Sequence, residues 1–407
     1  MKKMLLLSAA LFAASTPSLA KTLTVDVKGD AREAIQTALI EAKSGDVVEL
    51  PAGRFALDEG LSLDVDGVTV KGAGPDKTVL SFKGQTGAGE GLLVTSDRVL
   101  LTGFAVEDSK GDGIKSKGSD RITFHDLRVE WTGGPKPTNG AYGVYPVSSS
   151  NILVDKVTVR GASDAGIYVG QSSNIIVRNS LAEYNVAGIE IENSTNADVH
   201  DNVATHNTGG ILIFDLPNLP VMGGHSTRIF RNKVVDNDTP NFAPKGNIVA
   251  SVPMGTGVMV MANRSVHVFD NELANNATAH VMVVSYRQEF KDPRYNPLPR
   301  EVFIGANSFG KGGWDPGFPG GKELATAAGG SLPPVVWDGV DRWTSEGKPQ
   351  VEPVKLGFAG GKLMSFGMAD APMDPTKAKP ALIDVPTTPV SFPPEVKLPA
   401  DQPGVKS

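Results

Sequence analysis

Two glutamates lie two residues apart in the segment Ile189-Glu190-Ile191-Glu192, where they alternate with apolar residues. A period of two is typical of a β-strand, in which successive side chains point to opposite faces. Both carboxyls would therefore project from one face, with roughly 6.8 Å between their α-carbons. This separation falls within the carboxyl spacing of inverting glycosidases, so the pair indicates acid–base chemistry on a glycosidic bond.

The same face of neighbouring repeats carries other side chains suited to sugar chemistry. Tyr145 or Tyr168 could remove the proton at C5 of a uronate sugar if nearby lysines lowered the tyrosine pKa. Lys115 or Lys117 would then neutralise the carboxylate-derived enolate. Aromatic rings also stack on sugar faces, and carboxylates and amides bind hydroxyls. The candidate catalytic residues are Tyr168, Tyr145, Lys115, Glu190, Asp215 and His225; the candidate substrate-binding residues are Lys117, Asp164, Gln171, Glu192, Asn193 and Asn218.

Asp215 and His225 are a separate candidate acid–base pair. They flank the segment 216–224, so the two side chains meet only if this segment folds back on itself. The alternative is that neither side chain has a catalytic role, so that Asp215 is a carboxylate at the end of a strand and His225 is a histidine in a turn. The other histidines fall on a different strand of the repeat or near its corners, so we do not assign them to the site.

A recurring block of about 22 residues must position these side chains. Its apolar residues alternate as in strands, and Gly, Asn, Asp and Ser mark its corners. One block would form one coil, and stacked coils of parallel strands form a solenoid. We therefore predict an all-β fold, a right-handed single-stranded parallel β-helix. Its lead glycines are Gly113, Gly143, Gly166, Gly188, Gly210 and Gly257.

Two columns of this repeat support the stacking. Asn151, Asn174 and Asn196 fall in register at one corner, where stacked amides can hydrogen-bond from coil to coil. The outward positions of the later repeats are apolar, and a bare strip of that size would be a liability. We expect this strip to pack beneath the insertions or the C-terminal segment; it comprises Leu212, Phe214, Met259, Met261 and Met282.

The two ends of the chain, and three insertions within it, do not follow the repeat. Asp30 and Glu33 have the spacing of a capping box, which predicts a helix that covers the open first coil. The segments 132–141, 216–224 and 239–254 interrupt the repeats as insertions. We predict the β-helix domain over residues 21–310. Residues 311–407 are rich in Pro and Gly and are predicted to be extended along the solenoid or disordered, not a second domain.

Residues 1–20 have the pattern of a removable signal peptide. Lys2 and Lys3 precede a short apolar stretch, and Ser18-Leu19-Ala20 is a small-residue cleavage site. We expect an exported chain, periplasmic or secreted, with no membrane insertion, and we expect a monomer. Without Lys2 and Lys3 the chain has 37 basic against 45 acidic residues, which argues against nucleic acid as a partner. The chain has no cysteine, which excludes disulfides and thiolate chemistry.

The repeats, with the amphipathic helix and the segment GDVVELPAGRF before them, resemble the pectate-lyase-like superfamily of parallel β-helix proteins. The segment NTGGILIFDLPNLP followed by MGTGVMVMA is similar to a family of exported bacterial β-helix-repeat proteins with no settled activity. This resemblance covers residues 22–310 and implies an enzymatic activity on carbohydrates, that of a lyase, a uronate epimerase or a glycoside hydrolase. It also allows calcium, because calcium lyases use clustered aspartates; only Glu190, Glu192 and Asp215 come near that pattern.

Three functions therefore remain open. The first is β-elimination or C5 epimerisation of an acidic polysaccharide, although the Asp-Pro-His-Asp motif of the superfamily's alginate epimerases is absent. The second is a non-catalytic role in the cell envelope, binding a polysaccharide or a protein. The third is a glycoside hydrolase that uses paired carboxyls. Fold alone does not decide among them.

Overall fold

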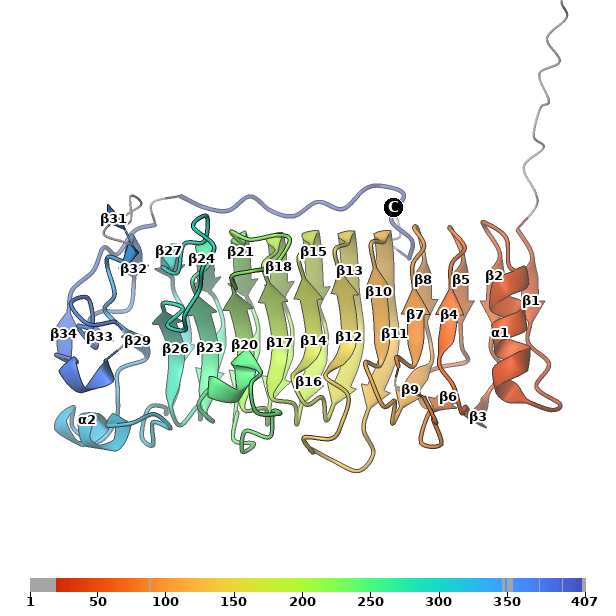
Figure 1. Ribbon diagram of the computed structural model, residues 1–407, viewed down its shortest axis with the longest axis horizontal. Coiled ribbons are helices and arrows are strands. Elements are labelled where there is room, and N and C mark those ends of the chain that lie inside the picture. The colour runs from red at the N-terminus through yellow and green to blue at the C-terminus, as the bar shows by residue number, and fades with distance from the viewer. Residues whose placement is uncertain are drawn as a thin grey trace, which may run out of the picture.

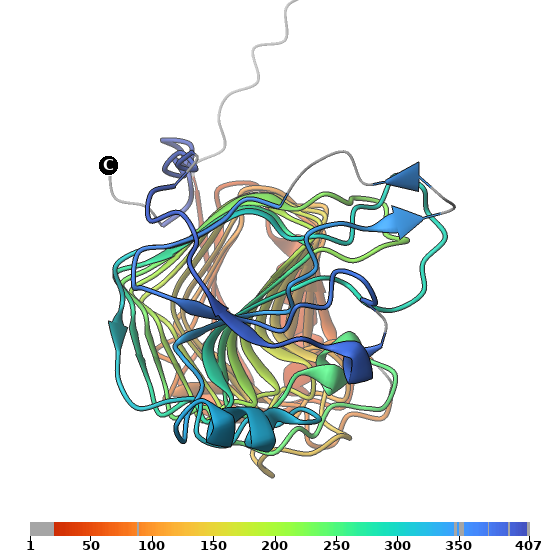
Figure 2. The ribbon, with the colours of Figure 1, turned by 90° about the vertical axis from the view of Figure 1, so that its left-hand side faces the viewer.

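The computed structural model describes residues 20–87, 89–345, 348–349, 354–372, 374–389 and 391–404. In these residues the chain forms a right-handed parallel β-solenoid of about 13 turns, with coils stacked side by side along one axis (Figures 1 and 2). The predicted fold class is confirmed. The predicted signal peptide falls almost wholly on residues 1–19, outside the described residues. No helix in the described part of the chain is long and apolar enough to span a bilayer.

One sheet of the solenoid carries the predicted site, and we call it the site sheet. Its strands pair in parallel except for the last, which is antiparallel to its neighbour. The strands are β4 (Leu61–Leu63), β7 (Leu92–Val94), β10 (Ile114–Lys117), β12 (Tyr142–Val147), β14 (Ala165–Gly170), β17 (Ala187–Glu192), β20 (Gly209–Phe214), β23 (Thr256–Met261), β26 (Ala279–Val284), β29 (Val335–Trp337), β33 (Leu363–Ser365) and β34 (Ala381–Ile383).

A second sheet bends around the remaining two sides of the coils. One side consists of β1 (Thr22–Thr24), β2 (Val47–Glu49), β5 (Thr69–Lys71), β8 (Leu100–Thr102), β11 (Asp120–Glu130), β13 (Ser150–Arg160), β15 (Ser173–Arg178), β18 (Thr195–His200), β21 (His225–Phe230), β24 (Arg264–Phe269), β27 (Arg300–Ile304) and β32 (Leu356–Phe358). The other consists of β3 (Gly53–Ala56), β6 (Thr78–Ser81), β9 (Ala105–Glu107), β16 (Leu181–Glu183), β19 (Val203–Thr205), β22 (Lys233–Val235), β25 (Glu272–Ala274) and β28 (Ser308–Phe309). The long strands β11 and β13 run through both sides.

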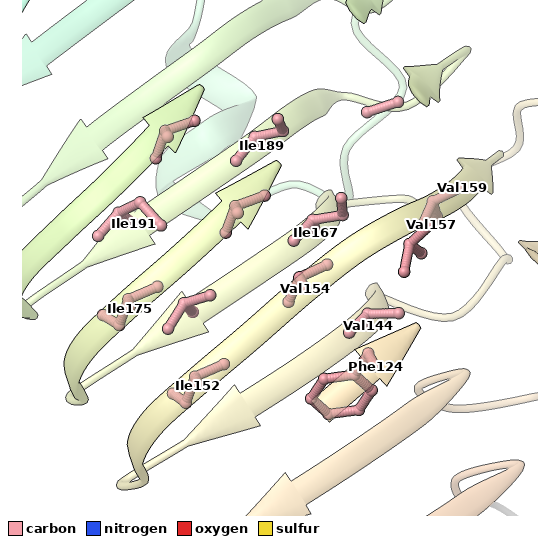
Figure 3. Packing of buried hydrophobic residues seen from close by; sticks show 14 of the residues in the cluster. Phe124, Val144, Ile152, Val154, Val157, Val159, Ile167, Ile175, Ile189 and Ile191 are labelled. Atoms are coloured by element: carbon pink, nitrogen blue, oxygen red, sulfur yellow. The ribbon is translucent and has the colours of Figure 1, made fainter. Parts of the chain in front are cut away.

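Apolar residues from facing sheets fill the interior of the coils. Ile167 of β14 and Ile189 of β17 are register partners, and Val154 of β13 approaches them from the second sheet (Figure 3). All three are fully buried. Because each coil repeats the same inward positions, the core continues from coil to coil and its burial stabilises the stack.

At each lead glycine, the strict alternation of inward-facing and outward-facing side chains is interrupted. The sequence pattern does not reveal this interruption. A Cβ on Gly143 would lie 2.2 Å from Val159 Cγ1, and one on Gly166 would lie 2.8 Å from Asn185 Nδ2, so both glycines face the interior. The residue after each glycine also faces the interior, since Val144 and Ile167 are in the core. The residue before each glycine consequently faces outward, on the surface that bears the candidate site.

Asparagines stack at the corners, as predicted, and also where no prediction was made. Asn174 donates to Asn151 at 3.2 Å and Asn196 donates to Asn174 at 3.4 Å, which confirms the predicted column. A fully buried column lies at another corner. There the Asn185 amide donates to Asn207, Asn207 to Asn237, and Asn237 to Asn276, each at 3.0 to 3.2 Å.

We expect Asn207→Ala to lower the free energy of unfolding by at least about 3 kcal/mol. The Asn207 side chain accepts from Asn185 and donates to Ala182 O, so its loss leaves several buried groups unpaired. Denaturant unfolding measures this loss. The half-buried Asn196→Ala is the control and should cost about 1 kcal/mol. Equal losses would show that burial of the column contributes nothing.

Helix α1 (Ala31–Glu41) covers the first coils, as the capping box predicts. The Asp30 side chain accepts the backbone N–H of Glu33 at 3.1 Å. Ile35 and Leu39 are buried in the same core cluster as Val48 of β2. The helix thus buries apolar surface that an uncapped first coil would expose to water.

Beyond residue 310 the coils continue, so the parallel pairing ends later than the predicted domain boundary. β29 pairs with β26 and β32 pairs with β27, both in parallel. Short elements follow the last regular coils: α2 (Gly321–Ala327), the antiparallel pair β30 (Thr344–Ser345) and β31 (Lys348–Pro349), and η2 (Pro375–Lys377).

The described residues of 386–404, which we call the strap, run back along the outside of the solenoid (Figure 1, the blue trace along the top). Val396 N donates to Asp198 of β18 at 3.1 Å, and Gln402 donates to Ile122 O of β11 at 3.1 Å. The proline-rich composition suits such an extended path, because proline donates no backbone hydrogen bond.

Candidate functional site

Three carboxyl groups lie together on the outer side of the site sheet, and we call them the carboxyl set. Asp164 stands at the corner before β14, and Glu190 and Glu192 project from β17. Their exposed fractions are 6%, 1% and 6%. The predicted columns are present, because Tyr168 pairs with Glu190 and Gly170 with Glu192 across β14 and β17. The sequence therefore placed these residues correctly relative to one another.

Two of the three carboxyls have a hydrogen-bond donor. The Tyr168 hydroxyl donates to Glu192 Oε1 at 2.6 Å, and Asn247 Nδ2 donates to Asp164 Oδ2 at 2.9 Å. Gly170 leaves room for this arrangement, because a Cβ there would meet the Tyr168 ring at 2.4 Å. Both oxygens of Glu190 are buried without a partner among the described residues. Glu190 is thus a buried polar group that no described residue satisfies by a hydrogen bond.

Burial and repulsion from neighbouring carboxyls raise the pKa of every member of the carboxyl set. Burial raises the pKa of Asp164 and of Glu192 to about 7; repulsion from Asp112 adds to the effect at Asp164, and repulsion from Asp164 and Asp215 adds to it at Glu192. For Glu190, burial and then the neighbouring Asp164 and Glu192 raise the pKa well above its usual value. Near neutral pH the set therefore keeps one or more protons, so proton donors and acceptors are present together.

Segments between the strands cover the carboxyl set. Asn247 comes from the insertion 239–254, whose short helix η1 (Ile248–Ser251) lies in front of the site sheet in Figure 1. Tyr295, from the connection between β26 and β27, donates to Asp215 O at 2.5 Å. We call the segments 216–224, 239–254 and 285–299 the cover loops.

The later, apolar end of the site face packs beneath these loops, as expected. The cluster joins Leu212, Phe214, Met259, Met261 and Met282 of the strands to Val249, Val252, Tyr286 and Tyr295 of the cover loops. Gly209 permits the approach, because a Cβ there would lie 3.1 Å from Val252 Cγ1. The cover loops are thus held down by burial of apolar surface.

Three tyrosine rings border the carboxyl set. The ring centroids of Tyr142, Tyr145 and Tyr168 lie 4.3 to 5.0 Å apart. The lowered pKa that Tyr168 or Tyr145 would need to act as a base is not found. Burial is the main cause that raises both pKa values, and Tyr168 is a donor to Glu192.

Lys115 lies beside Tyr145, as the sequence register predicts. The two are Cα partners, and Lys115 Nζ is 4.7 Å from the Tyr145 ring centroid. Lys115 Nζ also bonds to Glu90 Oε1 at 3.0 Å and to Asp112 Oδ2 at 3.3 Å. Because these two carboxylates already bind the Lys115 ammonium group, this group is not available to neutralise the negative charge of a substrate. Lys117, two residues on, is exposed.

The predicted pair of Asp215 and His225 does not form. The segment 216–224 does fold back, but Gly223 N and Gly224 N both donate to Asp215 Oδ1 at 2.8 Å. The His225 ring lies on β21 in the second sheet and contacts Ser226 Oγ at 2.9 Å. Burial raises the pKa of Asp215 to about 6. Asp215 thus serves to close the cover loop.

The remaining predicted binding residues are divided between loop support and open surface. Asn193 is buried, donates to Leu216 O and Val221 O, and accepts from Leu216 N, so it supports the cover loop 216–224. Asn218 is exposed and Gln171 is half-buried at the strand end. Within the described residues, none of these three side chains hydrogen-bonds to a member of the carboxyl set.

Sequence reasoning missed Tyr142, Asp112 and Glu90. Tyr142 and Asp112 directly precede the lead glycines Gly143 and Gly113, so strict alternation placed them facing inward. The interruption of the alternation at each glycine turns them outward instead. Glu90 precedes Gly91, the corresponding glycine of an irregular early coil, where a Cβ would lie 2.8 Å from Val106 Cγ1. The sequence signal that could have identified these three residues is their position directly before a lead glycine or the corresponding glycine.

Calcium, which the family resemblance allows, does not fit these residues. In the described part of the chain no group of three or more His, Cys, Asp or Glu side chains could hold a metal ion. Glu192 is hydrogen-bonded by Tyr168, and one oxygen of Asp215 by two backbone N–H groups. We therefore assign no metal-dependent step to this site.

Comparison with known proteins identifies the fold. No curated protein matches the chain. The A-module of a mannuronan C-5 epimerase from Azotobacter vinelandii is 15% identical, with a TM-score of 0.50, over 83% of this chain and 93% of that one. An alginate lyase from Paenibacillus is 17% identical, with a TM-score of 0.46, over 72% of this chain and 97% of that one. Residues 67–221 match the family model of the right-handed β-helix region. The chain therefore folds as a right-handed parallel β-helix.

Proposed function

We propose that this protein is an exported, carbohydrate-active β-helix protein and that the carboxyl set hydrolyses a glycosidic bond. The observation that carries the proposal is the buried carboxyl set on the outer side of the site sheet, where burial raises the pKa of Asp164 and of Glu192 to about 7. Catalytic acids and bases need pKa values near the working pH, and paired carboxyls of this kind perform glycoside hydrolysis. The epimerase module of similar fold is named for a polysaccharide substrate, which agrees with a carbohydrate as the substrate class.

The hydrogen bonds assign the two roles. Asn247 and Tyr142 both hydrogen-bond to Asp164 and favour its ionised form, so Asp164 acts as the base that takes a proton from the attacking water. Among the described residues, Glu192 receives such a bond from Tyr168 only, so it is the carboxyl that gives its proton to the leaving glycosidic oxygen. The water oxygen bonds to the anomeric carbon as the bond from that carbon to the leaving oxygen breaks, and the two carboxyls end with exchanged protonation states.

Access to the carboxyl set requires movement of the insertion 239–254. All three carboxyls are at least nine-tenths covered, and Asn247 bonds directly to Asp164. A sugar can reach Asp164 only when that bond opens. Such gating by loops is common in enzymes and excludes water once the loop closes again.

A second candidate is β-elimination or C5 epimerisation of an acidic polysaccharide. The observation in its favour is the contact between Lys115 and Tyr145 at the half-exposed edge of the site. A uronate carboxylate there would compete with Glu90 and Asp112 for the ammonium group. The carboxyl set would also repel an anionic sugar, so we rank this reaction second.

Incubation of the purified protein with neutral, uronate and amino-sugar glycans tests the proposal. Reducing ends measure bond cleavage, and ultraviolet absorbance measures unsaturated ends. New reducing ends without ultraviolet absorbance are the expected result. A rise in absorbance would replace hydrolysis by elimination, and a new C5 epimer in the uronate polymer would replace it by epimerisation. No change in any glycan would overturn the enzymatic proposal in favour of a binding role.

A further inference from the structure

The carboxyl set lacks a positive partner in the described part of the chain. The hydrogen-bond donors to its members are two tyrosines, Tyr168 and Tyr142, and one asparagine, and no basic side chain there forms an ion pair with them. Glu190 is fully buried, lacks a hydrogen-bond partner on either oxygen among the residues that the structure describes, and faces Asp164 and Glu192. Buried carboxylates are normally paired with a cation or a metal, so this arrangement is incomplete without a ligand.

The tyrosine rings beside the set also favour a cation. Tyr142 borders all three carboxyls and packs against the rings of Tyr145 and Tyr168. The faces of aromatic rings attract cations, and Lys115 already uses the Tyr145 ring in this way at 4.7 Å. Rings and carboxyls together therefore form a surface suited to an organic cation.

Other ligand classes suit the site less well. A metal ion would need a set of ligands that the described residues do not provide. A uronate would place like charges together, and a neutral hydroxyl would supply no positive charge to replace the protons that the carboxyls hold. An ammonium group supplies three donors and one positive charge, which suits both oxygens of Glu190 and its neighbours.

We infer that the glycan bound at the carboxyl set carries a free amino group, which binds Glu190 and lies against the face of Tyr142. This inference rests on the proposed function and specifies its substrate class as an amino-sugar polymer. Glu190 then selects the substrate, while Asp164 and Glu192 perform the chemistry.

Isothermal titration at pH 6 with an oligomer of glucosamine and its fully N-acetylated counterpart tests this inference. We expect the free amine to bind at least tenfold more tightly to the wild-type protein. The amine should also release protons from the carboxyls on binding, which titrations in two buffers of different ionisation enthalpy detect. Glu190→Gln should remove the preference, and the exposed Glu272→Gln should keep it.

The outcomes separate this inference from the proposed function. Equal affinity for the two oligomers, or no binding of the glucosamine oligomer, would overturn the amino-sugar inference; hydrolysis of a neutral glycan would then still support the proposed function. A preference for the amine without hydrolysis would support the inference and contradict hydrolysis. If Glu190→Gln fails to fold by circular dichroism, Tyr142→Leu is the second variant and should also lose the preference. A preference that survives in every folded variant would overturn the inference.

Discussion

Asp164→Asn and Glu192→Gln should each lower the rate of glycan hydrolysis by two to four orders of magnitude. General acid–base catalysis by a positioned side chain contributes about 10² to 10⁴ in rate. Both changes keep the size of the side chain and an acceptor oxygen for Asn247 or Tyr168, but Asp164→Asn removes the carboxylate that accepts the proton of the water, and Glu192→Gln removes the acid that protonates the leaving oxygen. The measurement is the rate of release of reducing ends at saturating substrate.

Two further variants make this result specific. Glu272 lies on β25, is exposed, and is far in the fold from the site sheet, so Glu272→Gln should keep full activity. Tyr168→Phe removes only the donor to Glu192, and we expect a smaller loss together with a shift of the pH–rate profile. Retained activity in both Asp164→Asn and Glu192→Gln would discard the carboxyl set as the active site.

The carboxyl set should also lower the free energy of unfolding of the protein as the pH rises from about 4 to about 7. A carboxyl whose folded pKa exceeds its unfolded value holds more protons in the folded state, so the free energy of unfolding falls as pH rises through that window. For Asp164, whose pKa rises from 3.8 to about 7, the full effect is ~4 kcal/mol. Coupling among the three carboxyls spreads this cost over the set.

Comparison with a triple variant isolates this cost from other titrations. Buried histidines act in the opposite direction, because burial lowers the pKa of His267 to about 4 and also lowers that of His280. We therefore expect Asp164→Asn/Glu190→Gln/Glu192→Gln to match the wild type near pH 4 and to exceed its melting temperature by several degrees at pH 7.5. A difference that stays constant with pH would contradict the raised pKa values.

The repeat positions of the sequence predicted the fold and the lateral order of the site residues. Ile167, Ile189 and Ile211 mark equivalent positions, so the register of Tyr168 beside Glu190 followed from counting. The helix after Asp30 followed from its local capping pattern. These features depend on neighbouring residues or on the repeat itself, which a single sequence displays.

The burial and the protonation of the site residues could not be predicted in the same way. Whether Glu190 is exposed depends on where the insertion 239–254 lies, and the contact of Asn247 with Asp164 joins residues 83 apart in sequence. The pKa values depend on that burial, so the lowered tyrosine pKa that a base would need is not found. Tyr142 was missed because the alternation is interrupted at Gly143, a geometric effect that strict alternation does not express.

Retention of protons by the carboxyl set at neutral pH is the central claim of this account, and infrared difference spectroscopy measures it directly. Protonated and ionised carboxyls absorb at different frequencies, so a titration from pH 4 to pH 9 counts protons still bound at pH 7. The account predicts a protonated carboxyl signal at pH 7 in the wild type that is reduced in Asp164→Asn/Glu190→Gln/Glu192→Gln. A wild-type signal that disappears by about pH 5, as for ordinary carboxyls, would contradict it.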